Sequence, residues 1–422
     1  MALLKMIGLL SNRYALVEGS SKLRLLVEVG LSDPEKVVDP ALNLTLVVDR
    51  STSMTGDALD NVKKAASHLI DSLKETDYVS VVGFSDQVSV VAPSQPVSDR
   101  ASIKQSIDQL FASGATNIYE AVDIGRREAM RHFSADKVNR IVLLSDGEAT
   151  AGVLEDDRIL ALADSSRTDG LSLSTLGVGE EYDEVLLGQL ARRGGGNHYF
   201  IRTPEAIPQI FTAELSKMKS VVAKNLKIRV KPADGTQVRM LNQRYRCETI
   251  NEEFFVHLDE HEAGRPQVTI LEVEVSARAE GDFCPATLDL TYDNLVDHVR
   301  GESLTASLQI TFVADSTQIR SGINREVLRR WEELSAMQEL KWILDRVKDR
   351  RIDSKTAVME LDRKTQVLVK KKAIDTARVF AQVGKTIVEE GGVSTTLSKR
   401  TMVACEEAEK GCVTGKTLLE DE

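Results

Sequence analysis

Between Leu42 and about Val222, short runs of β-branched and other apolar residues alternate with segments of helical periodicity. The run Leu42–Val48 is followed by apolar positions at steps of three and four from Ala58 to Leu73, which is the spacing of one buried helical face. This alternation is typical of a parallel sheet covered by helices, so it predicts a doubly wound α/β domain over residues 42–222. The other elements predicted for this domain are strands at Tyr78–Phe84, Gln87–Val91, Arg140–Ser145, Leu171–Gly179 and His198–Ile201, helices at about Asp99–Phe111 and Asn117–Phe133, and helices beginning at about Glu155 and Asp183.

The pattern changes after this domain. From Lys224 to Val313, six runs alternate inward and outward residues without intervening helices, which predicts a β-sandwich or barrel, and we assign a β-sandwich to residues 223–315. Residues 1–41 contain one more alternating run, Lys22–Val29, which is too short to fold alone. We therefore expect residues 1–41 to contribute to the later sandwich, so that the α/β domain is inserted within a β domain.

After Asp315 the sequence has helical periodicity to its end, which predicts a helical C-terminal region over residues 316–422. Two long amphipathic helices are expected at about Ile319–Asp349 and Ser354–Val388, and the pair Gly391-Gly392 stops the second. The amphipathic faces fit either self-association or packing against the sandwich, so the oligomeric state stays open.

The amino-acid composition limits the classes of partner that the chain is expected to bind. The chain has 54 Lys and Arg against 65 Asp and Glu, a net charge of −11, and about −14 of charge falls within residues 1–315. So acidic a surface does not favour nucleic acid or anionic lipid. No window approaches the roughly 18 to 20 apolar residues of a membrane span. The four cysteines form no CxxC pair, and the N-terminal segment lacks the features of a cleaved leader, so we expect a mature cytoplasmic protein with reduced thiols.

Three segments of the α/β domain carry side chains with hydroxyl or carboxylate oxygens, and we expect all three to lie at one edge of the sheet. The first contains Asp49, Ser51 and Ser53, the second presents Thr116, and the third presents Asp146 at the end of a strand. Loops that leave the carboxyl ends of parallel strands converge, and ligands bind there. Hydroxyl and carboxylate oxygens suit a hard divalent cation such as Mg²⁺, with Mn²⁺ or Ca²⁺ as alternatives.

This pattern resembles the von Willebrand factor type A family with a complete metal-ion-dependent adhesion site, and the bacterial cytosolic members of that family in particular. The family motif DxSxS, then Thr, then Asp is matched in order, over about residues 42–205. The resemblance implies that Ser51, Ser53 and Thr116 contact the metal, and that Asp49 and Asp146 hold it mainly through waters. The sequence departs from the common family pattern at Thr52, because Gly is frequent at this position in the family.

Other interpretations use the same residues. Ser and Thr before a helix are ordinary capping residues, and Asp146-Gly147 is an ordinary turn. Asp86 could line the same edge but is interpreted as a turn residue. Several other features are interpreted as structural: the P-loop-like Gly411–Thr417, the basic run Lys370–Lys372 on a helix, His257 and His261 as exposed residues at a strand end and hairpin, Gly194–Gly196 as a loop, and Trp331 and Trp342 as core.

The resemblance implies a metal-dependent protein–protein interaction module or scaffold that binds an Asp or Glu carboxylate of a partner protein. An accessory subunit of an ATPase or of a kinase or phosphatase system is the alternative. A metal-dependent hydrolase is less favoured, because the three motif segments contain no His and no nucleophile paired with a base. We therefore expect no enzymatic activity.

Overall fold

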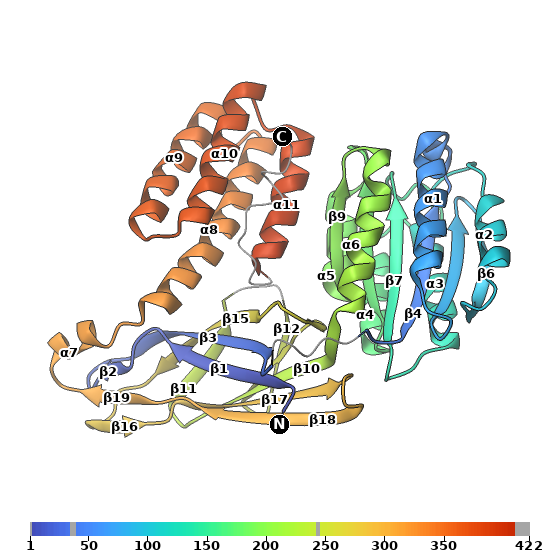
Figure 1. Cartoon of the computed structure of the whole chain (residues 1–422). Coiled ribbons are helices and arrows are strands. Elements are labelled where there is room, and N and C mark those ends of the chain that lie inside the picture. The colour runs from blue at the N-terminus through green and yellow to red at the C-terminus, as the bar shows by residue number, and fades with distance from the viewer. Residues whose placement is uncertain (1, 34–38, 242–244, 410–422) are drawn as a thin grey trace. The chain divides into compact units, whose positions relative to one another are not determined.

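The computed structural model describes residues 2–33, 39–241 and 245–409. The chain divides into two compact units (Figure 1): an α/β unit of Lys36–Lys224 with Asn294–Val299, and a second unit of Met1–Glu35, Asn225–Asp293 and Arg300–Glu422. The P-loop-like segment and Cys412 lie outside the described residues; Cys247, Cys284 and Cys405 are free thiols. No helix in the described parts of the chain is long and apolar enough to cross a membrane.

The α/β unit is built on one six-stranded sheet in the order β6-β5-β4-β7-β8-β9. Strand β4 pairs in parallel with both β5 and β7, and β8 and β9 continue the parallel pairing, whereas β6 runs antiparallel to β5. The carboxyl ends of the five parallel strands therefore share one edge. The strands are β4 (Leu42–Asp49), β5 (Tyr78–Phe84), β6 (Val88–Pro96), β7 (Val138–Ser145), β8 (Ser172–Val178) and β9 (Gly195–Ile201).

Helices cover both faces of this sheet. The side chains of β4 alternate between them: Leu44 and Leu46 join the core beneath α1, α2 and α6, and Val47 joins the core beneath α3, α4 and α5. This double burial explains why the strands read as continuous apolar runs. The helices are α1 (Asp57–Ser72), α2 (Arg100–Asp108), α3 (Ile118–Arg131), α4 (Asp156–Thr168), α5 (Glu184–Gly194) and α6 (Ile207–Lys219), with short 3₁₀ turns at Thr52–Met54 and Pro204–Ala206.

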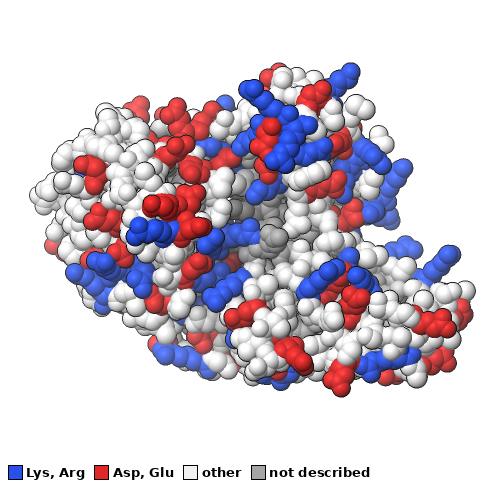
Figure 2. All heavy atoms as spheres, turned by 180° about the vertical axis from the view of Figure 1, so that it is seen from behind, with Lys and Arg blue, Asp and Glu red and all other residues white. Residues whose placement is uncertain are grey.

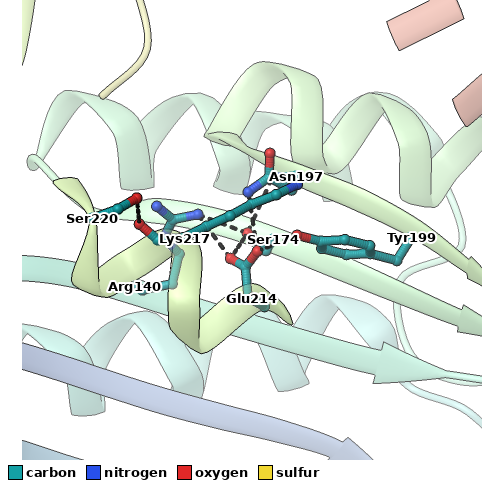
Figure 3. Close-up of polar contacts among 7 residues, drawn as sticks. All are labelled: Arg140, Ser174, Asn197, Tyr199, Glu214, Lys217 and Ser220. Carbon is teal, nitrogen blue, oxygen red and sulfur yellow. Dashed lines mark hydrogen bonds and ion pairs between the residues drawn. The ribbon is translucent and has the colours of Figure 1, made fainter. Parts of the chain in front are cut away.

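Helix α6 was absent from the predicted elements, and a buried polar cluster fixes it to the sheet (Figure 3). The Glu214 carboxylate of α6 accepts hydrogen bonds from Arg140 of β7 at 2.9 Å and from Ser174 of β8 at 2.6 Å. Asn197 and Tyr199 of β9 donate to its other oxygen at 3.0 and 2.7 Å. One carboxylate thereby joins α6 to three neighbouring strands.

The described residues of the second unit form three sheets. In the first, ordered β1-β3-β15-β11, the N-terminal strand β3 (Ser21–Leu31) pairs antiparallel with β15 (Gln267–Val275), so the run predicted at Lys22–Val29 shares a sheet with strands that follow the α/β unit. The second sheet has the order β12-β13-β10-β17-β18, with β14 beside β10, and the third has the order β16-β19-β2. The remaining strands are β1 (Leu4–Leu10), β2 (Tyr14–Leu16), β10 (Val221–Pro232), β11 (Thr236–Met240), β12 (Arg246–Ile250), β13 (Glu253–His257), β14 (His261–Glu262), β16 (Gly281–Phe283), β17 (Ala286–Asn294), β18 (Val299–Ser307) and β19 (Ile310–Val313).

In the described part of the chain, five helices follow these sheets. Helix α8 begins on the first sheet, where Val327 and Leu334 pack against Leu26, Val268 and Ile270. Farther along, α8 joins the other long helices in a core of their own. Basic side chains gather over the helices of this unit in Figure 2, in keeping with the less acidic composition after residue 315. The helices are α7 (Ser316–Ser321), α8 (Arg325–Lys348), α9 (Ser354–Lys370), α10 (Ile374–Glu390) and α11 (Thr395–Glu409).

Four predicted features of the chain are wrong in detail. The second long helix is two helices, because Lys372 has a φ of 63° and ends α9 within the run Lys370–Lys372. The first is also two, α7 and α8, separated at Gly322. Gly195 and Gly196 belong to β9 rather than to a loop. Trp342 is 56% exposed rather than a core residue. The stop at Gly391 is confirmed, with a left-handed φ of 72° that suits glycine.

Candidate metal centre

The candidate site lies at the shared carboxyl edge of the α/β sheet. Strand β4 ends in Asp49, which is fully buried, and the chain then turns through Ser51 into the 3₁₀ turn that contains Ser53. The backbone N–H of Ser51 donates to Oδ1 of Asp49 at 2.8 Å. This short side-chain-to-backbone bond shapes the turn and places the hydroxyls of Ser51 and Ser53 3.0 Å apart.

Strand β7 supplies the second acid. It ends at Ser145, and the next residue, Asp146, accepts a hydrogen bond from the Ser53 hydroxyl at 2.8 Å. The Ser145 hydroxyl donates to Oδ2 of Asp49 at 2.5 Å. Both oxygens of Asp49 are therefore already hydrogen-bonded within the protein, as suits a carboxylate that supports a site from behind. Ser145 was not among the predicted site residues.

The loop between α2 and α3 brings the third hydroxyl. Thr116 is 4% exposed, and a Cβ atom placed on Gly147 would lie 3.8 Å from its hydroxyl, so this loop lies beside the loop that follows β7. The Thr116 N–H donates to the Thr150 hydroxyl at 3.0 Å, and the Thr116 carbonyl accepts from Thr150 and Ala151. Thr150 thus fixes the backbone of Thr116, a role that the motif did not indicate.

The loops of the site are also joined to one another through the backbone. Thr52 donates to the carbonyl of Gly114 twice, from its N–H at 3.0 Å and from its hydroxyl at 3.1 Å. The departure at Thr52 therefore adds a hydrogen bond between two loops of the site. Gly114 has a φ of 79°, and a side chain there would collide with the Asp86 carboxylate. Asp86 is an exposed turn residue in contact with this loop.

Burial shifts the pKa values of the acidic side chains of the site. It raises the pKa of Asp49 to about 6, against the hydrogen bonds from Ser145 and Ser51, and the nearby charge of Asp146 raises it further. Burial also raises the pKa of Asp146, to which the charge of Glu181 adds, although the bond from Ser53 opposes both. Two acids whose charged forms are disfavoured in this way would be relieved by a cation between them.

These residues fit a small divalent cation by their chemistry. Two hydroxyls in contact, a third on the neighbouring loop and two carboxylates form an all-oxygen donor set, which Mg²⁺ prefers. Among the described residues, no group of three or more His, Cys, Asp or Glu could hold a metal. A site of this kind contains only two such residues and depends on hydroxyls for the rest.

Two histidines that were interpreted from the sequence as exposed structural residues lie in the second unit. His257 is partly exposed and forms a 2.8 Å contact with Glu248. His261 was predicted to be exposed, but it is fully buried in β14, and burial lowers its pKa to about 4. The prediction was wrong because the hairpin position of His261 did not reveal that β14 pairs with β10 and is covered.

A family model for the von Willebrand factor type A domain matches residues 43–213. The chain contains a von Willebrand factor type A domain. The protein YfbK of Escherichia coli (strain K12) is 30% identical over 226 residues, which is 53% of this chain and 39% of YfbK. Inter-alpha-trypsin inhibitor heavy chain H2 of Mus musculus is 30% identical over 174 residues, or 39% of this chain and 18% of that protein. The chain thus spans less than half the length of these curated relatives.

Two solved structures resemble the chain over nearly all of its length. A von Willebrand factor type A protein from Catenulispora acidiphila aligns with a TM-score of 0.73 and 15% identity over 96% of both chains. The ArnB paralog VWA2 from Sulfolobus acidocaldarius aligns with a TM-score of 0.65 and 17% identity over 97% of this chain and 98% of that one. At these identities the likeness shows the fold alone.

Proposed function

We propose that the von Willebrand factor type A domain of this chain binds a divalent cation, Mg²⁺ in the first instance, and through it an Asp or Glu side chain of a partner protein. Ser51, Ser53 and Thr116 would contact the cation, and Asp49 and Asp146 would support it, which together make a metal-ion-dependent adhesion site. The observation that carries the proposal is the cluster in which Ser53 touches both Ser51 and, at 2.8 Å, Asp146.

The charge of the site supports capture of a carboxylate. Three neutral hydroxyls would contact the cation directly, whereas the two carboxylates, one of which is held on both oxygens by Ser51 and Ser145, would support it through water, so a coordination position stays open. A cation in this state supplies an attractive point for one more anionic oxygen. The chain itself is acidic, so its own field would repel an acidic partner in the absence of the cation.

We propose binding rather than catalysis. The segments that form the site, 49–56, 109–117 and 146–155, contain no His, Cys or Lys that could serve as a base or an activated nucleophile. An accessory subunit of an ATPase or of a kinase or phosphatase system would use the same site and differ only in the identity of its partner.

The test uses displayed peptides, because the partner is unidentified. Peptides that the full chain selects in Mg²⁺ are retested singly, with each Asp changed to Asn and each Glu to Gln. We expect capture to vanish in EDTA, after one acid-to-amide change, and with Ser51→Ala. Thr55→Ala, which removes an exposed hydroxyl in the same loop, should leave capture unchanged. Capture that persists in EDTA, or that survives every acid-to-amide change, would contradict the proposal.

A further inference from the structure

The second unit contains a cavity of about 680 Å³ that is separate from the candidate metal site. Strand β1 forms one wall, the link between β18 and β19 forms another, and the junction of α7 and α8 closes the third side. This volume is in the range of small-molecule sites. The lining residues are Gly8, Leu9, Leu10, Arg13, Ser307, Leu308, Gln309, Ser321, Gly322, Ile323, Asn324 and Arg325.

Hydrogen bonds hold the walls of the cavity in place. Asn12 donates from its side chain to the carbonyl of Ile319 at 2.9 Å, and the backbone N–H of Asn324 donates to the carbonyl of Ser11 at 2.9 Å. Gly322 packs so closely that an added Cβ would lie 2.3 Å from the side-chain oxygen of Asn12. The junction of α7 and α8 is therefore fixed against the N-terminal segment, and the cavity is formed before any ligand arrives.

The charge that lines the cavity is of one sign. Among the described residues that line it, Arg13 and Arg325 alone are charged. Within the described part of the chain neither forms an ion pair, and the guanidinium of Arg13 lies 4.8 Å from the ring centre of Tyr14. Glu326, the next residue after Arg325, is held by Arg329 at 3.0 Å and by Arg330 at 3.4 Å. Among the residues that the structure describes, these two arginines thus have no counterion, although the net charge of the chain is −11.

Exposed apolar side chains accompany these charges. Leu9 is 37% exposed and Ile323 is 43% exposed, and both line the cavity. A bare inorganic anion would leave this apolar surface in contact with water, whereas a molecule with an apolar body would cover it. The planar guanidinium matches a carboxylate in geometry and can bind it through two parallel hydrogen bonds.

We propose that this cavity binds a small amphiphilic carboxylate, with the carboxylate at Arg13 and Arg325 and the apolar body against Leu9, Leu10 and Ile323. Ser307 and Gln309 supply further polar groups at the rim. The site shares no residue with the metal centre, because it lies in the other compact unit of the chain.

The experiment uses octanoate as the probe and isothermal titration calorimetry on the full chain. We expect a dissociation constant on the order of 1 mM, as suits a ligand of this size. Each substitution, Arg13→Gln or Arg325→Gln, should weaken binding roughly tenfold. Arg320→Gln removes the same charge from exposed α7 without touching the cavity, and it should leave the constant unchanged.

Two comparisons separate this site from general attraction of anions. From butanoate to hexanoate to octanoate, affinity should rise roughly fourfold for each methylene that becomes buried. Octanamide, which keeps the apolar body and lacks the charge, should bind at least about tenfold more weakly than octanoate. The proposal would be overturned if all three arginine variants lost the same affinity for octanoate, or if octanamide bound as tightly as octanoate. It would also be overturned if no binding were detected at an octanoate concentration of roughly ten times the expected dissociation constant.

Discussion

Removal of the Glu214 carboxylate should destabilise the α/β unit strongly. Glu214 is 2% exposed and Arg140 is 3% exposed, so the substitution Glu214→Ala removes the carboxylate that pairs with a buried guanidinium at 2.9 Å. The same carboxylate also accepts hydrogen bonds from Ser174, Asn197 and Tyr199. Loss of one member of a buried ion pair costs about 3 to 5 kcal/mol, and the loss of three further hydrogen bonds to the same carboxylate places the expected loss at the upper end of that range.

The pKa of Glu214 leads to the same expectation. Burial raises this pKa, but the charges of Arg140 and Lys217 and the hydroxyls of Ser174 and Tyr199 together outweigh burial, so it lies below its ordinary value. A carboxylate whose folded-state pKa is depressed stabilises the fold above its unfolded pKa, near 4.5, and this contribution is lost as the pH falls through the folded value. The destabilisation by Glu214→Ala should therefore be full at neutral pH and should shrink in acid.

Differential scanning calorimetry of the whole chain provides the assay. The melting temperature of the α/β unit should fall by roughly 6 to 20 °C, at about 2 to 4 °C per kcal/mol for a unit of this size. Both tryptophans, Trp331 and Trp342, belong to the second unit, so their fluorescence follows that unit separately. Asp164→Ala, which breaks an exposed pair with Arg193 in the same unit, is the matched control and should change stability by less than about 1 kcal/mol.

The double variant Arg140→Met with Glu214→Leu separates charge from packing. Because it removes both charges and keeps comparable volume, it should be more stable than Glu214→Ala and closer to the parent chain. The reasoning fails if Glu214→Ala loses less than about 1 kcal/mol, or if the double variant is no more stable than the single one.

Two further predictions concern a buried histidine and a glycine at a positive φ. The pKa of His261 falls from 6.5 to about 4 on folding, so the unfolded chain binds more protons between these values. In urea titrations followed by tryptophan fluorescence, the free energy of unfolding of the second unit should fall by about 3 kcal/mol from pH 7 to pH 4. His261→Gln should reduce this pH dependence. An equal pH dependence in both proteins would refute the prediction. Gly114→Ala places a Cβ against Asp86 at a positive φ, so it should destabilise the α/β unit by about 1 kcal/mol or more and weaken Mg²⁺ binding, as calorimetry would measure. An unchanged melting temperature would show that this loop is free to move.

The sequence revealed the parts of the candidate site that local pattern encodes. Strand β4 is a continuous apolar run that ends in an acid, as Asp49, and β7 ends one residue before Asp146, so a reader of the sequence can place both acids at the carboxyl edge. The supporting contacts are not local. Ser145 and Thr150 act on residues 96 and 34 positions away, and nothing in their own neighbourhood indicates those partners.

The same reason explains the errors elsewhere. The cluster around Glu214 assembles residues up to 74 positions apart, and Arg140 sits in an apolar run that gave no sign of a charged partner. The end of α9 could not be predicted because it carries neither Gly nor Pro. Lys372 itself adopts the left-handed conformation there. Burial of His261 follows from pairing between β14 and β10, which periodicity does not specify. The misses at Glu214 and His261 depend on tertiary contacts rather than on local preference.

The central claim, a divalent cation at Ser51, Ser53 and Thr116, is tested most directly by titrating the metal-free chain with Mn²⁺ and counting the bound ion by electron paramagnetic resonance. We expect one ion per chain, displaced by Mg²⁺, with affinity reduced at least about tenfold by Ser51→Ala and by Asp146→Asn. Thr55→Ala should bind as the parent chain does. An ion that binds equally well to Ser51→Ala, or the failure of any ion to bind to the folded parent chain, would contradict the claim.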